Sequence, residues 1–346
     1  MVNNPERIGI SLGGEPYGGF TDVDVEAKMD EAPRTFTIST TERPGEFKFP
    51  PGTPCTITAN GDPVLTGFTN RYQPKGNATT HTISIAGRGK AQDFVDSAAI
   101  IPGMHLLKST PGDLAVALDN WGLGMRDEVG LSPVPVQHIA TGEKGYEAVE
   151  RYLRPQGAVM MEQGDGQVVI TNASVAKRHA GSLHESIFVD YSGEISDDRQ
   201  YSEYNVAGQS RAGWDSAALQ VWETVANTAV GRYRPFIGWF EGDVDAGRAR
   251  ARAQNEQVRA AGFSISCQIM VQGWRDHDGT LWQPNWQIYI DSPILLHIEQ
   301  DMLIEGVQYH QSNSGSFATL SLVDPRAHGG KPGRSQSDKA WGANYQ

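Results

Sequence analysis

Basic side chains are scarce in this sequence of 346 residues. Lysine and arginine together number 29, against 41 aspartates and glutamates, so the formal net charge is −12. Affinity for nucleic acid depends mostly on lysine and arginine contacts to phosphate groups. The sequence therefore argues against nucleic acid as a tightly bound ligand, although an acidic surface would let DNA slide past without sticking.

Long apolar runs and paired cysteines are also missing. No stretch of about 18 consecutive apolar residues occurs, and residues 1–7 lack a basic segment followed by an apolar one. We expect neither a transmembrane helix nor a membrane anchor nor a signal peptide. The two cysteines, Cys55 and Cys267, lie in strand-like runs without a neighbouring histidine. They are expected to be buried, reduced thiols and not nucleophiles.

Glycine and proline are plentiful, at 39 and 19 residues, which is typical of a strand- and turn-rich protein. Alternating apolar residues predict short strands at 20–29, 34–41, 53–59, 64–71 and 80–86. Asn60-Gly61 between two of them predicts a tight hairpin turn, because both residues tolerate positive φ. A first small antiparallel β-barrel or sandwich is therefore expected over residues 1–98, with a short helical turn at 91–98.

The pattern changes to α+β over residues 99–185. A helix is predicted at 111–122. Its apolar face would consist of Leu114, Val116, Ala117, Leu118 and Trp121. A second helix is predicted at 142–153. Residues 159–161 and 168–171 are expected to form a hairpin around Gly164-Asp165-Gly166.

Strand character returns over residues 186–327, first at 186–195 and 201–209 and then from 263 to 323. A helical insertion at about 211–262 holds a helix that Asp243 or Asp245 can cap and Gly262 can end. Residues 328–346 are expected to be a flexible C-terminal extension. The predicted fold is mainly β, with two small antiparallel β-barrel (tube-like) domains flanking an α+β region and the second barrel interrupted by the insertion.

Several segments in a fixed order resemble one protein family. They include Thr66-Gly67-Phe68, Gly87-Arg88-Gly89-Lys90 and the strand 201–210. The final segment, 273–325, contains Trp274 and Thr280-Leu281-Trp282-Gln283-Pro284. Their order is similar to that in the baseplate hub proteins of contractile-tailed phages, the Mu-like tail protein P family, and to the hub portion of type VI secretion spike proteins. The resemblance touches most of residues 20–325. The chain has Pro284-Asn285 where the family pattern suggests Pro-Gly, and asparagine also tolerates positive φ.

The resemblance implies a structural protein of the virion tail baseplate, assembled in the host cytoplasm. It implies a homotrimeric ring that joins the tail tube to the central spike and adapts six-fold to three-fold symmetry. Other implied partners are further baseplate proteins and the tape-measure protein, while DNA passes through the lumen without specific binding. We add the hypothesis that acidic residues line that lumen.

Clusters of reactive side chains are few. Asp276-His277-Asp278 is interpreted as a solvated turn, and Glu194, Asp197 and Asp198 as a charged loop rather than a glycosidase pair. Gly87-Arg88-Gly89-Lys90 lacks the spacing of a phosphate loop and is interpreted as a tight turn. We predict no catalytic residue, cofactor or metal.

The residues expected to matter are structural or interface positions: Gly67, Gly87, Arg88, Asp93, Trp274, Trp282 and Pro284. Arg88 is expected to pair with a carboxylate such as Asp93 or with a neighbouring chain. Two alternatives stay open. One is a tail-associated cell-wall hydrolase with the α+β region as its catalytic domain. The other is a glycan-binding β module for host adsorption, in which Trp274, Trp282 and Trp286 stack on sugars.

Overall fold

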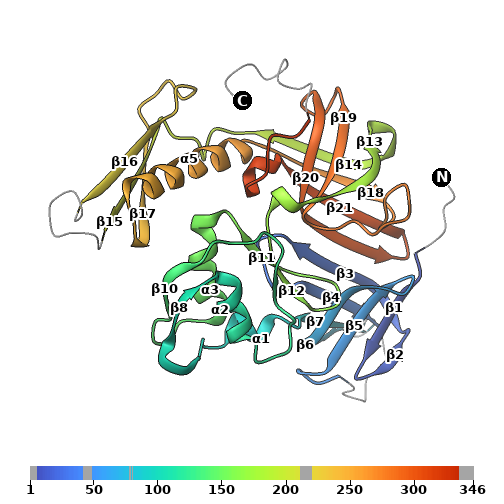
Figure 1. Ribbon diagram of the computed structural model, residues 1–346. Coiled ribbons are helices and arrows are strands. Elements are labelled where there is room, and N and C mark those ends of the chain that lie inside the picture. The colour runs from blue at the N-terminus through green and yellow to red at the C-terminus, as the bar shows by residue number, and fades with distance from the viewer. Residues whose placement is uncertain (1–5, 42–48, 78, 80, 211–219, 335–346) are drawn as a thin grey trace.

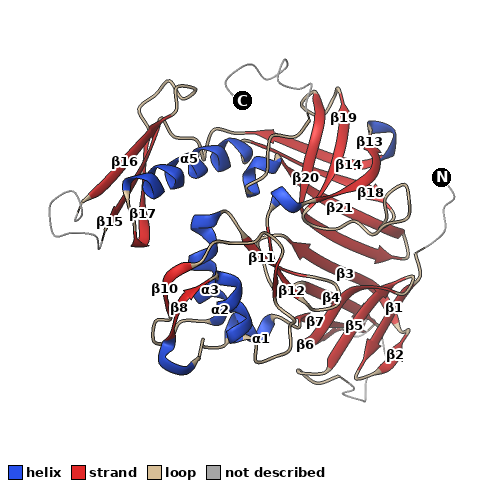
Figure 2. Cartoon of the chain, in the orientation of Figure 1, coloured by secondary structure: helices blue, strands red, loops and turns tan. Residues whose placement is uncertain are grey.

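The computed structural model describes residues 6–41, 49–77, 79, 81–210 and 220–334. Strands dominate, as the sequence predicts, and four parts follow along the chain (Figures 1 and 2). Two β units lie one above the other, an α+β middle domain lies beside the first, and an arm extends beside the second. None of the helices in the described ranges has the length and apolar character needed to cross a membrane.

The first β unit is built from seven antiparallel strands in the spatial order β3-β4-β7-β6-β5-β1-β2. Their bounds are β1 Ile8–Leu12, β2 Glu15–Tyr17, β3 Phe20–Lys28, β4 Thr35–Thr40, β5 Pro54–Ala59, β6 Asp62–Gly76 and β7 His81–Gly89. The predicted hairpin joins β5 to β6, with Asn60 and Gly61 at φ of 49° and 93°. The alternation read from the sequence therefore predicts β3 to β7, whereas β1 and β2 were not predicted.

The second β unit combines segments on both sides of the arm. It contains β13 Lys177–Leu183, β14 Phe188–Ile195, β18 Ile265–Gln272, β19 Trp286–Ser292, β20 Ile298–Ser312 and β21 Gly315–Val323. Strands β14, β18, β21 and β20 are neighbours in that order, β19 also pairs with β20, and β13 pairs with β19 in parallel.

One ladder joins the two units. β20 pairs antiparallel with β3 through Gly306↔Lys28 to Gln311↔Val23, so the units form a continuous sheet of 13 strands. One apolar core contains buried side chains from both units, such as Val25 and Val307. Within the described ranges the strand pairings follow an open path, so the two closed barrels predicted from the sequence are not confirmed.

The middle domain contains three helices and two small sheets. The helices are α1 Gln92–Asp96, α2 Pro111–Leu118 and α3 Gly145–Leu153. The strands are β8 His105–Ser109, β9 Arg126–Asp127, β10 Val134–His138, β11 Val159–Glu162 and β12 Val168–Thr171. The predicted 159–171 hairpin is the β11–β12 pair. The predicted apolar face of the first long helix is wrong at two positions, because Val116 and Ala117 are exposed.

The arm, residues 203–262, is a separate layer pair. β15 Glu203–Gln209 lies between β16 Val221–Ala226 and β17 Pro235–Asp243. Helix α5, Ala246–Gly262, covers one face of this sheet, and its first turn is capped by Asp245, which accepts from the main-chain N–H of Arg248 at 2.9 Å. The sequence predicts the strand 201–209 as part of the second barrel, but β15 belongs to this small sheet.

The chain after β21 packs on the body as far as it is described. Pro325–His328 form a buried 3₁₀ helix, and a Cβ on Gly262 at the end of α5 would lie only 2.1 Å from the main-chain N of Ala327. The main-chain N–H of Asp301 donates to the carbonyl of Arg334 at 3.0 Å. The predicted flexible extension is therefore wrong for residues 328–334, and residues 335–346 lie outside the described part.

Candidate functional site at the domain junction

A buried arginine links three parts of the molecule. Arg34, just before β4, is 2% exposed. Its Nε donates to the carbonyl of Glu162 in the middle domain at 3.0 Å, and its Nη1 donates to the carbonyl of Val64 on β6 at 2.7 Å. Its Nη2 reaches Oε1 of Gln283 in the second β unit at 3.2 Å. A planar guanidinium suits such a role, because its donors are fixed in direction.

The side chain of Glu162 completes the junction from the other side. Its Oε2 accepts the main-chain N–H of Arg34 at 2.7 Å, and its Oε1 accepts that of Ala91, before α1, at 2.8 Å. Burial raises the pKa of Glu162 to about 7, although these two N–H groups and the Arg34 guanidinium act in the opposite direction. The carboxyl thus fixes the exit of the first β unit against the end of β11.

Glycines let the chain approach itself closely here. A Cβ on Gly67 would lie 2.1 Å from the carbonyl oxygen of Arg88. A Cβ on Gly87 would lie 2.2 Å from the carbonyl oxygen of Phe68 and 2.6 Å from the Phe36 ring. These two predicted positions are therefore close-approach points between β6, β7 and β4. The sequence suggested a turn at 87–90, whereas Gly87 and Gly89 continue β7.

Arg88 and Asp93 do not meet as the sequence suggested. The Arg88 guanidinium pairs with the carboxylate of Asp96, at the end of α1. Asp93 lies exposed in the first turn of the same helix. The expected pairing of Arg88 with a carboxylate is therefore found, but the partner is Asp96, one turn of helix beyond the suggested Asp93.

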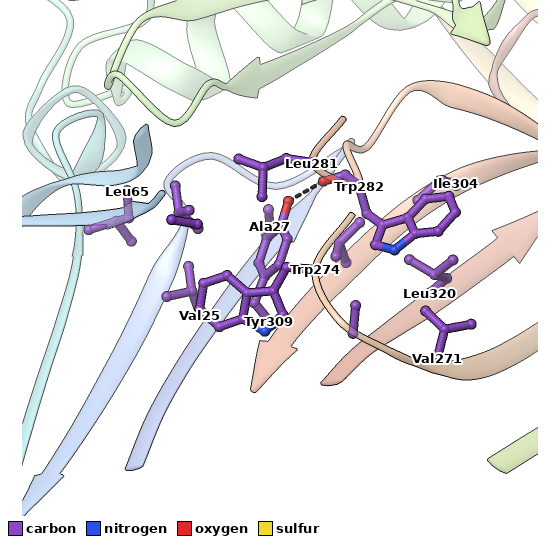
Figure 3. Close-up of a cluster of buried hydrophobic side chains, with 14 of the residues drawn as sticks. Val25, Ala27, Leu65, Val271, Trp274, Leu281, Trp282, Ile304, Tyr309 and Leu320 are labelled. Carbon is purple, nitrogen blue, oxygen red and sulfur yellow. Dashed lines mark hydrogen bonds between the residues drawn. The ribbon is translucent and has the colours of Figure 1, made fainter. Parts of the chain in front are cut away.

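Trp274 and Trp282 lie inside the joint core (Figure 3). They are 0% and 4% exposed, and the Trp274 ring lies 5.1 Å from the Tyr309 ring. The Trp274 Nε1–H donates to the carbonyl of His310 at 3.0 Å, and the Tyr309 hydroxyl donates to the carbonyl of Trp282. Within one chain these tryptophans fix the segment between β18 and β19 against β20, and neither presents a ring face to solvent.

A histidine is enclosed beside them. The His179 ring lies between the rings of Trp282 and Trp286, at 4.7 and 4.5 Å. Its Nδ1 is 2.9 Å from Oδ2 of Asp276, and its Nε2 accepts the main-chain N–H of Gln283 at 3.2 Å. Because a main-chain N–H can only donate, the proton sits on Nδ1 and the ring is neutral. Burial lowers the pKa of His179, while Asp276 opposes that shift.

Asp276 is not the solvated turn residue that the sequence suggested. It is 8% exposed, and its Oδ1 accepts the main-chain N–H groups of Asp278 and Thr280. Burial alone would raise its pKa, but the His179 and main-chain hydrogen bonds outweigh burial and lower it. His277 and Asp278 do lie exposed. The interpretation as a solvated turn is wrong for Asp276, because its partner His179 lies 97 positions away in the sequence.

The turn at Pro284-Asn285 forms as expected, although it departs from the Pro-Gly of the family pattern. Asn285 adopts φ of 59° and follows Pro284, which is buried. The Asn285 Nδ2 donates to the hydroxyl of Thr171 on β12 at 2.7 Å, and its main-chain N–H donates to the carbonyl of Ile304. Asparagine therefore adds a link between the second β unit and the middle domain that glycine could not make.

The carboxylates considered as a glycosidase pair lie exposed or form an ion pair elsewhere. Glu194 lies exposed on β14, and Asp197 pairs with Arg232 at 2.6 Å. Across the described ranges, no three His, Cys, Asp or Glu side chains gather where they could hold a metal ion. Sequence reasoning missed Arg34, Glu162 and His179, since each acquires its role from partners far away in the chain.

Comparison with known proteins gives a consistent result along the chain. Three family models match successive segments. They are the N-terminal domain of Mu phage baseplate assembly protein GpP-like proteins at residues 7–89, the second domain of baseplate hub protein gp44-like proteins at 91–172, and the fourth domain of Mu phage baseplate assembly protein GpP at 245–330. Together they cover the first β unit, the middle domain and the strands β18 to β21 of the second β unit, while β13 and β14 lie between matched segments.

Individual relatives agree with these matches. The chain is 27% identical to the baseplate hub protein gp44 of Escherichia phage Mu over 334 residues, covering 92% of this chain and 88% of that protein. The 43 kDa tail protein of prophage MuSo2 from Shewanella oneidensis superposes with a TM-score of 0.82 at 27% identity, covering 93% of this chain and 99% of that one. A type VI secretion component of E. coli shares the fold alone, with a TM-score of 0.53, 8% identity and coverage of 91% and 76%.

Proposed function

The chain belongs to the family of Mu-type phage baseplate hub proteins, and on this premise we propose that three copies of it close a ring at the base of a contractile tail. The ring joins the tail tube to the central spike and adapts six-fold to three-fold symmetry. Each copy supplies two β units, so three copies place six such units around the axis. The role is structural and not catalytic.

One observation carries the proposal. The main path of the continuous sheet ends in the described part of the chain at β2 on one side and at β14 on the other, and a side branch through β19 ends at β13. β14 pairs only with β18 there, and its Val189 and Tyr191 side chains are 52% and 44% exposed. An open strand edge with apolar side chains is a template for pairing with another chain. Two different open ends suit a head-to-tail contact, which closes into a ring when the rotation is three-fold.

The other proposed partners follow from this arrangement. Further baseplate proteins and the tape-measure protein would meet the faces of the ring, and the protein would be a virion component assembled in the host cytoplasm. DNA would pass through a lumen lined by acidic residues without specific binding, since the net charge of −12 repels phosphate. Each β unit would complete its barrel in the assembled ring.

Light scattering on the purified protein tests the proposal. One chain has a mass of 37.7 kDa, so the expected mass of the ring is about 113 kDa, three times that value. Tyr191→Lys places a charge on the β14 edge and is expected to give monomers, whereas Tyr233→Lys, on an exposed residue of the arm, leaves the mass unchanged. A monomer at every concentration, or a trimer insensitive to Tyr191→Lys, would contradict the proposed contact.

A further inference from the structure

Among the described residues, no second layer covers the outer face of the small sheet in the arm. In the register of the three strands, Ala207 on β15 lies opposite Trp222 on β16 and Trp239 on β17. Asn205, two residues earlier, lies opposite Thr224 and Ile237. Side chains two residues apart share a face, so both tryptophans and Ile237 lie on one side of the sheet.

The opposite side of the sheet is the one that α5 covers. Tyr204, Val206 and Phe240 are buried there together with Ala249 and Ala253 of the helix. The outer face must therefore be the exposed one. Trp222 is 52% exposed, Ile237 64% and Trp239 62%.

Hydrogen bonds hold the outer face in one arrangement. The Trp222 Nε1–H donates to the hydroxyl of Thr224 at 3.2 Å, and that hydroxyl donates to Oδ1 of Asn205 at 2.6 Å. The Asn205 Nδ2 donates to the carbonyl of Phe236 at 3.1 Å. The polar groups around the tryptophan are thus satisfied within the sheet, so a partner can cover the face without leaving them unpaired. A surface that is ordered before binding loses less entropy when it binds.

The arm also differs from the rest of the chain in charge. Residues 203–262 contain seven arginines and seven aspartates or glutamates, so the net charge of −12 lies entirely outside the arm. The three register rows at Glu203, Asn205 and Ala207 place nine strand positions on the outer face. One of these nine, Glu203, is charged. An apolar face with a single charged position can approach an acidic protein surface with little repulsion, whereas two acidic bodies repel each other.

The middle domain of the same chain also carries large apolar side chains that are exposed, on its entry loop, β8 and α2. Ile100, Leu107 and Val116 are 70%, 61% and 59% exposed. A head-to-tail contact between copies needs two different patches that attract each other, and the chain supplies both. Figure 1 shows the arm extending away from the β units, on the side of the molecule where the middle domain also lies.

We propose that the outer face of the arm sheet, formed by Trp222, Ile237 and Trp239, docks on the middle domain of a second copy of this chain. The inference rests on the proposed ring and adds a peripheral contact to the one between strand edges. Within a ring already joined by its sheets, such a contact forms at the high effective concentration of a linked site. Each aromatic side chain buries about 150–250 Å² when fully covered, so the face supplies part of the roughly 800 Å² that a standard interface buries on each partner.

The native cysteines allow a direct test by thiol labelling. Cys55 and Cys267 are 1% and 3% exposed, and burial raises the pKa of each to about 12, so neither reacts readily at neutral pH. An Ile237→Cys variant therefore carries one reactive thiol on the face. We expect Ellman's reagent to react at least tenfold more slowly with the trimer than with monomers obtained by dilution or by Tyr191→Lys. Val258→Cys, on the exposed side of α5, serves as the control that reacts equally in both.

Substitutions on the two surfaces complete the test. Trp239→Glu and Leu107→Glu are each expected to raise the concentration at which the trimer half-dissociates by tenfold or more, with unchanged circular dichroism. A trimer whose Ile237→Cys thiol reacts at the monomer rate would overturn the inference while leaving the proposed ring intact. That result would assign the face to a different tail protein. A chain that stays monomeric at every concentration would overturn both.

Discussion

Two hydrogen bonds join Arg34 to Glu162, which lies 128 positions away in the sequence. The main-chain N–H of Arg34 donates to the Glu162 carboxylate at 2.7 Å, and the Arg34 guanidinium donates to the Glu162 carbonyl at 3.0 Å. The same guanidinium also reaches Val64 and Gln283. The two β units and the middle domain therefore share one buried polar centre, and their relative positions depend on it.

Removal of the arginine side chain should be costly. Arg34→Met leaves the carbonyls of Glu162 and Val64 without their donor and the buried Glu162 carboxyl without a nearby cation. We expect a loss of about 3–5 kcal/mol in the free energy of unfolding, as for other buried charge pairs that lose one partner. Arg88→Met, which breaks the more exposed pair with Asp96, should cost at most about 1 kcal/mol. Urea denaturation measures both, and equal losses would contradict the assigned role of Arg34.

The raised pKa of Glu162 predicts a pH dependence. Its ordinary value is 4.5 and burial raises it to about 7. Between these values the folded protein holds a proton that the unfolded chain has released, so the free energy of unfolding falls as pH rises through this window. A shift of this size corresponds to roughly 3 kcal/mol. Thermal unfolding of Glu162→Gln between pH 4.5 and 8 should lack this slope.

The matched control for that experiment is Glu128→Gln. Glu128 is a partly exposed carboxylate of the same domain, paired with Arg126, and its replacement should leave the wild-type slope in place. A slope that persists in Glu162→Gln would assign the dependence to another group.

His179 predicts a dependence of the opposite sign. Burial holds its pKa below the ordinary value of 6.5, so the folded protein resists a proton that the unfolded chain accepts. Stability from this group is present above pH 6.5 and is lost as pH falls below it. His179→Phe keeps a ring beside Trp282 and Trp286 but removes the side-chain donor to Asp276, which keeps only its main-chain donors, and we expect a cost of about 2–4 kcal/mol at pH 7.

The acidic limb of the stability curve distinguishes the two histidines of this region. His179→Phe should remove the loss of stability just below pH 6.5, whereas His277→Phe, at an exposed ring, should retain it. If both variants retain that limb, His179 is not buried in its neutral form.

Local patterns in the sequence are sufficient for most of the strands. Strands β3 to β7 of the first β unit follow from alternation, and the Asn60-Gly61 turn and the positive φ of Asn285 follow from what asparagine and glycine tolerate. These features depend on residues next to each other. The sheet that contains β15 was predicted wrongly, because the local pattern of this segment indicates a strand but not its partners.

The junction could not be predicted in this way. Arg34 looks like a surface residue in sequence, and Asp276 like a turn residue, because each is buried by partners from other domains. The family resemblance indicated Gly67, Gly87, Trp274 and Trp282 without giving a reason for them. The structure supplies one in the close approach of strands at the glycines and in the shared core at the tryptophans.

The close approach at Gly67 gives a prediction with a clean control. Gly67→Ala would place a Cβ 2.1 Å from the Arg88 carbonyl oxygen and 2.6 Å from Cα of Gly89. Both obstacles are main chain in the middle of a sheet, so they cannot move aside as a flexible side chain would. We expect a loss of about 3 kcal/mol in the free energy of unfolding, at the upper end for overpacking. Gly18→Ala meets no atom within 4 Å and should change stability by less than about 0.5 kcal/mol. If the two variants unfold at the same urea concentration, β6 and β7 are not packed as closely at Gly67 as the structure has them.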